Sequence, residues 1–225
     1  GRDEEKINKI VNHIGQVNQV AILDVDSGFD TNRTVVTLVG PPDAIAEAAY
    51  QGIKIASEVI DMALHNGTHP RIGATDVCPF IPISGVSEKE CIEISKKVAE
   101  SVGNKLKIPT YLYEKSAKNS FRTKLPDIRK GEYEGLSKKL TDPKWKPDYG
   151  PSHMNKRSGA TIIGCRDFLI AYNINLNTRD HRLATDIAFE LREVGRSKRI
   201  PHPNSKNLLD GDIVRQENGN PVKVP

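Results

Sequence analysis

One histidine in this chain is followed closely by groups that acid–base chemistry uses. His69 precedes Pro70 and is followed within a few residues by Arg71 and Asp76. An imidazole can exchange a proton near neutral pH, and a guanidinium can bind a carboxylate in a bidentate manner. Asp76 could orient His69 or Arg71 by a charge-assisted hydrogen bond. On these residues alone, a structural histidine in a turn is the commoner case and acid–base catalysis is the alternative.

Two carboxylates and an arginine form a second candidate group. Asp24 and Asp26 alternate within the run 20–26, so they share one face near the end of a predicted strand. Open sheets often bind ligands at such ends. Arg33 follows and could hold a substrate carboxylate, while either aspartate could hold an amine or stabilise an imidazolium. A simple turn after the strand is the alternative, and spacing alone favours it.

The third candidate is the polar loop 148–161, which leads directly into an apolar run. It offers hydroxyls, an amide, basic side chains and glycines that expose backbone donors. These groups suit an anionic or heteroaromatic ligand. A solvated loop is the alternative, and composition alone favours it.

Composition narrows the function classes. The 225 residues carry a formal net charge of +4, and 37% of them are hydrophobic and 5% aromatic. This balance lacks the strong basic patch and the stacking aromatics of a nucleic-acid-binding domain. The three cysteines form no CxxC pair and, with the scattered histidines, predict no metal site. No apolar stretch approaches the roughly 20 residues of a membrane span, so we expect no membrane partner and a cytoplasmic location.

Hydrophobic periodicity indicates the elements that must position these groups. It predicts helices over residues 3–14, 42–63, 87–106, 133–140 and 179–194. It predicts strands over residues 20–26, 34–39, 77–83, 110–113, 161–165 and 168–174. Helices alternate with single strands and with pairs of strands. We therefore expect an α+β fold, an α/β sandwich in which helices pack on one face of a mixed β-sheet.

Several peptides in this order resemble one family, the formiminotransferase domain of glutamate formiminotransferase, which in animals is fused to a cyclodeaminase. The resemblance runs from the first residue to about Arg199 and is carried by segments 23–28, 32–35, 60–62, 69–74, 76–82, 131–134, 147–152, 159–161 and 168–176. It implies transfer of a formimino group between 5-formiminotetrahydrofolate and L-glutamate, or N-formimino-L-glutamate in reverse, in histidine degradation. His69, in the motif His69-Pro70-Arg71-Ile72-Gly73, matches the family's catalytic histidine.

The resemblance also implies a ligand segment, partners and a domain division. The folate-binding segment would comprise Gly150, Pro151, Ser152, His153, Met154, Asn155, Lys156, Arg157, Ser158 and Gly159. The co-substrate would be polyglutamylated tetrahydrofolate, with no metal. The family forms homodimers, and a cyclodeaminase partner or fusion is expected. Residues 1–167 would form the N-terminal subdomain without its first strand, and residues 168–225 would begin an incomplete C-terminal subdomain.

Two other functions fit the same residues. A glutamate formyltransferase would need almost the same site, because only the transferred one-carbon group differs. A folate-binding or interaction protein without catalytic activity could use the same subdomain. His69 as a proton shuttle distinguishes both transferases from the binding protein. Asp24, Asp26, Arg33, Arg71 and Asp76 are the candidate substrate contacts.

Overall fold

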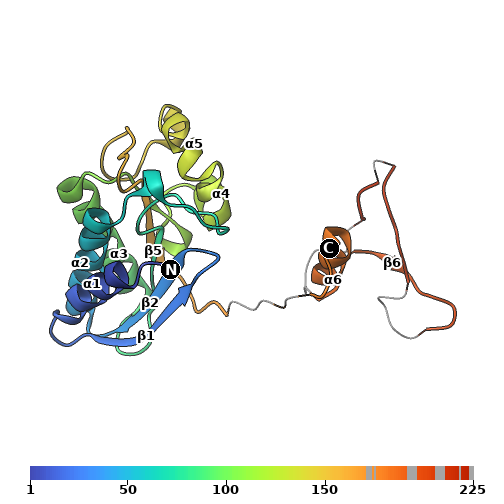
Figure 1. The fold of residues 1–225 in the computed structure, drawn as a ribbon, viewed down its shortest axis with the longest axis horizontal. Coiled ribbons are helices and arrows are strands. Elements are labelled where there is room, and N and C mark those ends of the chain that lie inside the picture. The colour runs from blue at the N-terminus through green and yellow to red at the C-terminus, as the bar shows by residue number, and fades with distance from the viewer. Residues whose placement is uncertain (171–173, 175, 192–196, 206–210, 218, 223–225) are drawn as a thin grey trace. The chain divides into compact units, whose positions relative to one another are not determined.

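The computed structural model describes residues 1–170, 174, 176–191, 197–205, 211–217 and 219–222 (Figure 1). Contacts between Cα atoms divide the chain into two units, Gly1–Leu169 and Ile170–Pro225. The division lies next to the expected boundary after residue 167. All three candidate segments belong to the first unit.

A three-stranded parallel sheet with the strand order β3-β5-β4 forms the centre of the first unit. The strands are β3 (Val77–Phe80), β4 (Thr110–Leu112) and β5 (Thr161–Cys165). Strand β5 lies in the middle, and all of its residues are buried. Its continuous apolar run is typical of a parallel strand that is covered on both faces.

Alternate side chains of β5 enter two hydrophobic cores. Ile163 and Cys165 belong to the first core, which includes residues of α2 (Pro42–Val59) and α3 (Glu88–Leu106). Ile162 belongs to the second core with residues of two short helices, α4 (Leu125–Arg129) and α5 (Glu132–Lys139). The parallel sheet is therefore covered on both faces. Ile72, in the loop before β3, belongs to the same core as Ile128 of α4 and Leu136 of α5.

A hairpin of β1 (Ala21–Gly28) and β2 (Arg33–Val39) forms a separate antiparallel sheet. Helix α1 (Glu4–Gly15) packs against α2, where Gly52 allows close approach of Ile14 (Figure 1). In the described residues, no strand pairing joins this hairpin to the parallel sheet. Helices together with parallel and antiparallel sheets confirm the predicted α+β class.

Local signals in the sequence explain the starts of two long helices. The Asp3 side chain accepts a hydrogen bond from the backbone nitrogen of Lys6 at 3.0 Å, before α1. Before α3, the Ser87 hydroxyl accepts from the backbone nitrogen of Glu90 at 3.2 Å, and the Glu90 carboxylate accepts from the backbone of Ser87 at 2.8 Å. These contacts satisfy backbone donors that a helix start leaves unpaired. The reciprocal contacts of Ser87 and Glu90 form a capping box.

The predicted strand over residues 168–174 is wrong in the part that the structure describes. Phe168, Leu169 and Ile170 are irregular, and their exposed fractions are 69%, 71% and 89%. β-branched and aromatic residues favour a strand only where a neighbouring strand and a covered face receive them. Residues 171–173 lie outside the described residues. The second unit contains α6 (His181–Leu191), β6 (Arg199–Ile200) and β7 (Asp212–Ile213).

A buried ion pair holds the polar stretch between β4 and β5. Arg122 donates from Nη2 to Oδ1 of Asp148 at 2.8 Å, and the two side chains are 4% and 1% exposed. The other carboxylate oxygen of Asp148 accepts from the backbone nitrogen of Leu112 at 2.8 Å. This stretch contains α4, α5 and three 3-10 helices, at Glu114–Ser116, Ser120–Arg122 and Pro143–Trp145. The ion pair thus fastens a loop-rich segment to the end of β4.

We predict that Asp148→Asn lowers the free energy of unfolding by about 3 kcal/mol, because it leaves a buried guanidinium without its counter-ion. Urea unfolding followed by the fluorescence of Trp145, the chain's single tryptophan, measures the effect. Glu93→Gln is the matched control, since Glu93 pairs with Lys96 on the surface and such pairs contribute at most about 1 kcal/mol. Equal unfolding midpoints for the two variants would contradict the prediction.

Candidate active site

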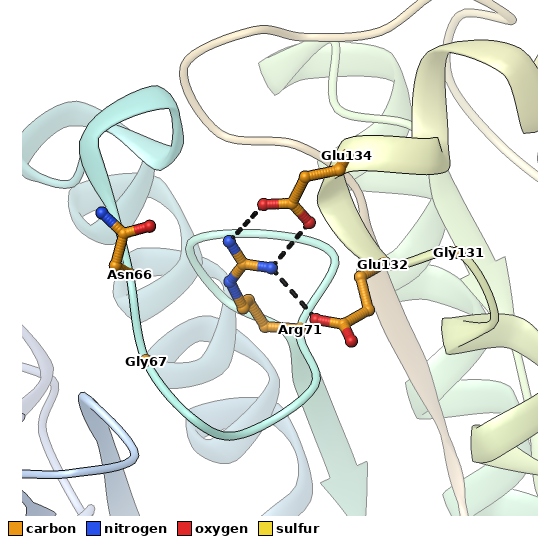
Figure 2. Close-up of a pocket in the computed structure, with 6 residues that line it drawn as sticks. All are labelled: Asn66, Gly67, Arg71, Gly131, Glu132 and Glu134. Atoms are coloured by element: carbon orange, nitrogen blue, oxygen red, sulfur yellow. Dashed lines mark hydrogen bonds and ion pairs between the residues drawn. The ribbon is translucent and has the colours of Figure 1, made fainter.

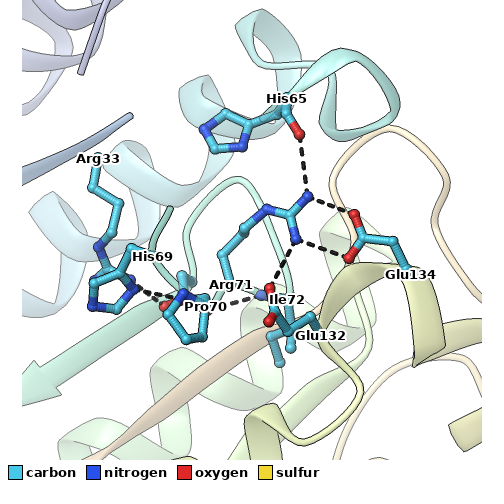
Figure 3. A network of polar contacts seen from close by, with 9 residues as sticks. Arg33, His65, His69, Pro70, Arg71, Ile72, Glu132 and Glu134 are labelled. Carbon is cyan, nitrogen blue, oxygen red and sulfur yellow. Dashed lines mark hydrogen bonds and ion pairs between the residues drawn. The ribbon is translucent and has the colours of Figure 1, made fainter. Parts of the chain in front are cut away.

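His69 lies partly buried on the loop between a short 3-10 helix (Met62–Leu64) and β3. Its Nδ1 is 2.7 Å from the backbone oxygen of Pro70 and 3.1 Å from Nη1 of Arg33 (Figure 3). No hydrogen bond to its Nε2 is found within the described residues. The ring is held through one nitrogen, so the other can exchange a proton with a ligand.

The carboxylate of Asp76 ties three segments together beside this histidine. Its side chain is only 8% exposed. Oδ2 accepts from Nη1 of Arg33 at 2.7 Å and from Nη2 of Arg129, while Oδ1 accepts from the backbone nitrogen of Ile72 at 2.9 Å. Arg33 begins β2, Arg129 ends α4, and Ile72 belongs to the loop of the histidine. Two guanidinium groups share one carboxylate, which leaves a net positive charge at this point.

The guanidinium of Arg71 takes part in a different set of contacts. Nη1 and Nη2 donate to the two carboxylate oxygens of Glu134 at 2.8 and 2.6 Å. Nη1 also donates to Glu132 at 3.1 Å (Figure 2), and Nη2 donates to the backbone oxygen of His65 at 3.1 Å (Figure 3). The hydrogen bond with Glu134 raises the pKa of Arg71, and the same bond lowers the pKa of Glu134. An open pocket beside this cluster is lined by Asn66, Gly67, Arg71, Gly131, Glu132 and Glu134.

Asp76 and Arg71 belong to two separate clusters of polar contacts. Asp76 was expected to contact His69 or Arg71 directly, but among the described residues it is connected to His69 only through Arg33. Arg71 is directed away from the imidazole toward α5, because the two glutamates there bind its guanidinium. Its backbone oxygen also accepts from the backbone nitrogen of Tyr133 at 2.9 Å. Arg71 therefore attaches the histidine loop to α5.

The segment predicted to bind folate is bonded to this same loop. The backbone nitrogen of Ala74 donates to the oxygen of Ser158 at 2.9 Å, and that of Ala160 donates to the oxygen of Ile72 at 3.0 Å. At their closest, Gly73 and Gly159 form an isolated bridge. Tertiary structure thus brings the candidate catalytic loop and the candidate folate segment together, although many residues separate them in sequence.

Glycine is required on both sides of this junction. A Cβ atom on Gly73 would lie 1.9 Å from the backbone oxygen of Ala160, and one on Gly159 would lie 2.1 Å from that of Ile72. Gly159 also has a φ of +69°, which favours glycine. A residue with a side chain could not make either of these close backbone contacts.

The folate segment presents some of its side chains to solvent and buries others. Gly150, Ser152, His153, Lys156 and Arg157 are exposed, Pro151, Met154 and Asn155 are partly buried, and Ser158 and Gly159 are buried. The Asn155 side chain accepts from the backbone nitrogens of Arg157 and Ser158 at 3.2 and 3.1 Å. Arg157 donates to the backbone oxygen of Glu58 at 2.6 Å. Lys156 is therefore the basic side chain of this segment best placed to meet a ligand, while Arg157 also supports the loop.

The two aspartates of the hairpin lie on the same face as Arg33. In the antiparallel register Asp26 is opposite Val35 and Gly28 is opposite Arg33, and Asp24 follows the same alternation. Both aspartates are exposed. The register confirms that they share a face.

Sequence reasoning missed Arg129. It lies in a polar stretch with no recognisable motif, so only folding identifies it as the second partner of Asp76. Glu132 and Glu134 were part of the family resemblance, but their spacing alone did not indicate that they bind Arg71. Their alternation at the start of α5 is a weak signal, because charged residues are common in the first turn of a helix.

The histidine, cysteine and acidic side chains of the described residues were compared with the requirements of metal binding and thiolate chemistry. They contain no group of three or more His, Cys, Asp or Glu side chains that could hold a metal ion. Burial raises the pKa of the Cys78 and Cys91 thiols to about 12, so both are protonated at neutral pH. A search of the same residues for a helix long and apolar enough to cross a membrane finds none.

We predict that Gly73→Ala lowers the free energy of unfolding by about 1–3 kcal/mol, because its Cβ would force the histidine loop and the folate segment apart. Gly135→Ala is the matched control, since a Cβ at Gly135 in α5 meets nothing within 4 Å. Alanine there should preserve or slightly increase stability. Thermal or urea unfolding compares the two, and a Gly73 variant as stable as the control would refute the close approach.

Comparisons with known proteins identify the family of this chain. Residues 1–166 match the family described as the formiminotransferase domain, N-terminal subdomain. The chain is 45% identical over 202 residues to a formimidoyltransferase-cyclodeaminase of Dictyostelium discoideum, covering 89% of this chain and 37% of that protein. It is 47% identical over 201 residues to the mouse protein of the same name, with the same coverage of each chain.

Shorter relatives are also similar. The chain is 45% identical over 195 residues to a glutamate formimidoyltransferase of Streptococcus pyogenes serotype M1, covering 87% of this chain and 65% of that protein. All of these relatives extend beyond it, since the chain spans less than two thirds of their length. The match over residues 1–166 contains every candidate site residue, and the chain therefore belongs to the formiminotransferase family, with its N-terminal subdomain in that range.

Proposed function

We propose that this chain is part of a glutamate formimidoyltransferase that moves a formimino group between 5-formiminotetrahydrofolate and L-glutamate in histidine degradation. One observation carries the proposal: in a chain of this family, His69 is held through Nδ1 while its Nε2 has no partner among the described residues. The names of the relatives support formimidoyl transfer to or from glutamate.

The reaction needs one group that both accepts and returns a proton. The amine of glutamate must lose a proton to attack the electrophilic formimino carbon. The tetrahedral intermediate then expels N5 of the folate, which leaves more readily once it is protonated. His69 can take the first proton at Nε2 and return it to the leaving nitrogen. In the reverse reaction the same histidine takes the proton from N5 of the folate and returns it to the nitrogen of glutamate.

Charge at the site suits a substrate that carries carboxylates. Arg33 and Arg129 share the single carboxylate of Asp76, so one positive charge remains without a counter-ion in this cluster. A guanidinium binds a carboxylate through two parallel hydrogen bonds. We assign the substrate carboxylate to this pair, and the substrate amine to Asp24 or Asp26 on the same face of the hairpin. Arg71 supports the loop and is not assigned to substrate.

The folate is proposed to lie along residues 150–159, beside the histidine loop. The hydrogen bonds from Ala74 to Ser158 and from Ala160 to Ile72 keep this segment close to His69. The buried hydroxyl of Ser158 has no hydrogen-bond partner in the described part of the chain. Lys156 is exposed and suits the anionic tail of a polyglutamylated folate.

The oligomeric state and a cyclodeaminase partner are also proposed, on the basis of the family resemblance. We expect a homodimer in the cytoplasm, as the family resemblance implies. Several relatives are named formimidoyltransferase-cyclodeaminase, which describes those proteins as bifunctional. For the present protein we propose a cyclodeaminase that is either fused or separate.

We predict that His69→Ala, in the complete protein, lowers turnover by at least about tenfold, since a positioned acid–base group typically contributes a factor of about 10² to 10⁴. Folate binding should survive, because the imidazole acts on the proton and not on the pterin. Steady-state assays with 5-formiminotetrahydrofolate and with the 5-formyl compound measure turnover and distinguish the two transferases. His13→Ala is the control, since His13 lies on α1 and its imidazole contacts only the backbone oxygen of Lys9 among the described residues. Unchanged turnover would remove His69 from catalysis.

We predict that Lys156→Ala together with Arg157→Ala weakens binding of polyglutamylated folate about threefold to fivefold, as expected for exposed ion pairs worth up to about 1 kcal/mol. Binding of the monoglutamate should change less, because it lacks the anionic tail. Calorimetric titration with both folates measures the difference. Lys89→Ala, at the exposed start of α3, is the control for net charge. An equal loss of affinity for both folates would indicate that the polyglutamate tail binds elsewhere.

A further inference from the structure

Nδ1 of His69 has two neighbours that require opposite protonation states. The backbone oxygen of Pro70, at 2.7 Å, can only accept a hydrogen bond. Nη1 of Arg33, at 3.1 Å, can only donate one. A neutral imidazole carries a single proton, on either Nδ1 or Nε2. The contact with Pro70 therefore favours a proton on Nδ1 and a bare Nε2, whereas the contact with Arg33 favours a bare Nδ1 and a proton on Nε2.

Arg33 is anchored where it can exert this effect. Its Nη1 donates to Asp76 at 2.7 Å, so one nitrogen with two hydrogens serves both the carboxylate and the imidazole. Asp76 is fixed in turn by the backbone of Ile72 and by Arg129.

The same arrangement allows Arg33 to leave. Its side chain is 23% exposed, whereas those of Asp76 and Arg129 are 8% and 13% exposed. If Arg33 turns toward a ligand, Asp76 keeps the ion pair with Arg129 and the hydrogen bond from Ile72. No buried carboxylate is then left without a partner, which is the costly outcome that usually prevents such a movement.

We infer that Arg33 is a positioning residue that competes with the Pro70 carbonyl for Nδ1 and so determines which nitrogen of His69 carries the proton. A substrate carboxylate that draws Arg33 away releases Nδ1. Nε2 then gives its proton to solvent, Nδ1 takes one from solvent and donates a hydrogen bond to the backbone oxygen of Pro70, and the bare Nε2 becomes the base. This coupling of carboxylate binding to base formation rests on the proposed function, but the competition at Nδ1 does not.

Long-range proton–nitrogen NMR spectra of the unliganded chain with ¹⁵N-labelled histidine test the competition directly. They distinguish a protonated from a bare ring nitrogen, and the signal missing from His69→Gln assigns His69. We expect Arg33→Met to change the tautomer ratio about tenfold in favour of a protonated Nδ1, as expected for loss of one charged hydrogen bond. Arg2→Met is the matched control, because Arg2 donates to Phe29 beside the same hairpin and does not contact the imidazole. An unchanged ratio in Arg33→Met would overturn the inference.

Arg33→Lys covers the case in which the methionine variant fails to fold. Lysine keeps a positive charge for Asp76 but presents it as a single compact donor, so the tautomer ratio should fall between those of the wild type and Arg33→Met. A wild-type ratio in a folded Arg33→Lys, with Arg33→Met unfolded, would count against the inference.

Addition of L-glutamate tests the release of Arg33. It should shift the wild-type ratio toward a protonated Nδ1 and leave the Arg33→Met ratio unchanged. A wild-type ratio that does not respond to saturating L-glutamate would refute the carboxylate switch. These spectra need no turnover, so they remain decisive if the transferase assay fails.

Discussion

The buried carboxylate of Asp76 is the constraint on which the candidate site depends. It binds Arg33 from β2, Arg129 from α4 and the backbone of Ile72, and these segments belong to three different parts of the first unit. A charge buried to this degree is tolerated only when partners surround it. The requirement to satisfy one carboxylate therefore brings the hairpin, the helix and the histidine loop to the same place.

Two further connections keep that loop in position. Arg71 binds both oxygens of Glu134, which fastens the loop to α5. On its other side, Gly73 and Gly159 approach so closely that neither could carry a side chain. The imidazole of His69 is thus supported by an ion-pair cluster, a helix and a second loop. Such support suits acid–base chemistry, because a small displacement of the reacting groups strongly reduces the rate.

Much of the fold could be predicted from local patterns. The capping box at Ser87 and the helical spacing of α2 and α3 are short-range signals, and the structure contains these helices. The strand predicted across Phe168–Ile170 failed for the opposite reason. Strand formation depends on a partner, and the side chains of Phe168, Leu169 and Ile170 are exposed.

For the site, local sequence patterns were enough to identify the groups that are present: the resemblance around His69 indicated the family, and alternation placed Asp24 and Asp26 on one face. Which charges meet depends on how the chain folds. The tertiary structure paired Asp76 with Arg33 and Arg129, paired Arg71 with Glu134, and placed one donor and one acceptor in competition at Nδ1 of His69. The physical reason is that hydrogen bonds and ion pairs act over a few ångströms, and residues far apart in sequence reach that distance only after the core has formed.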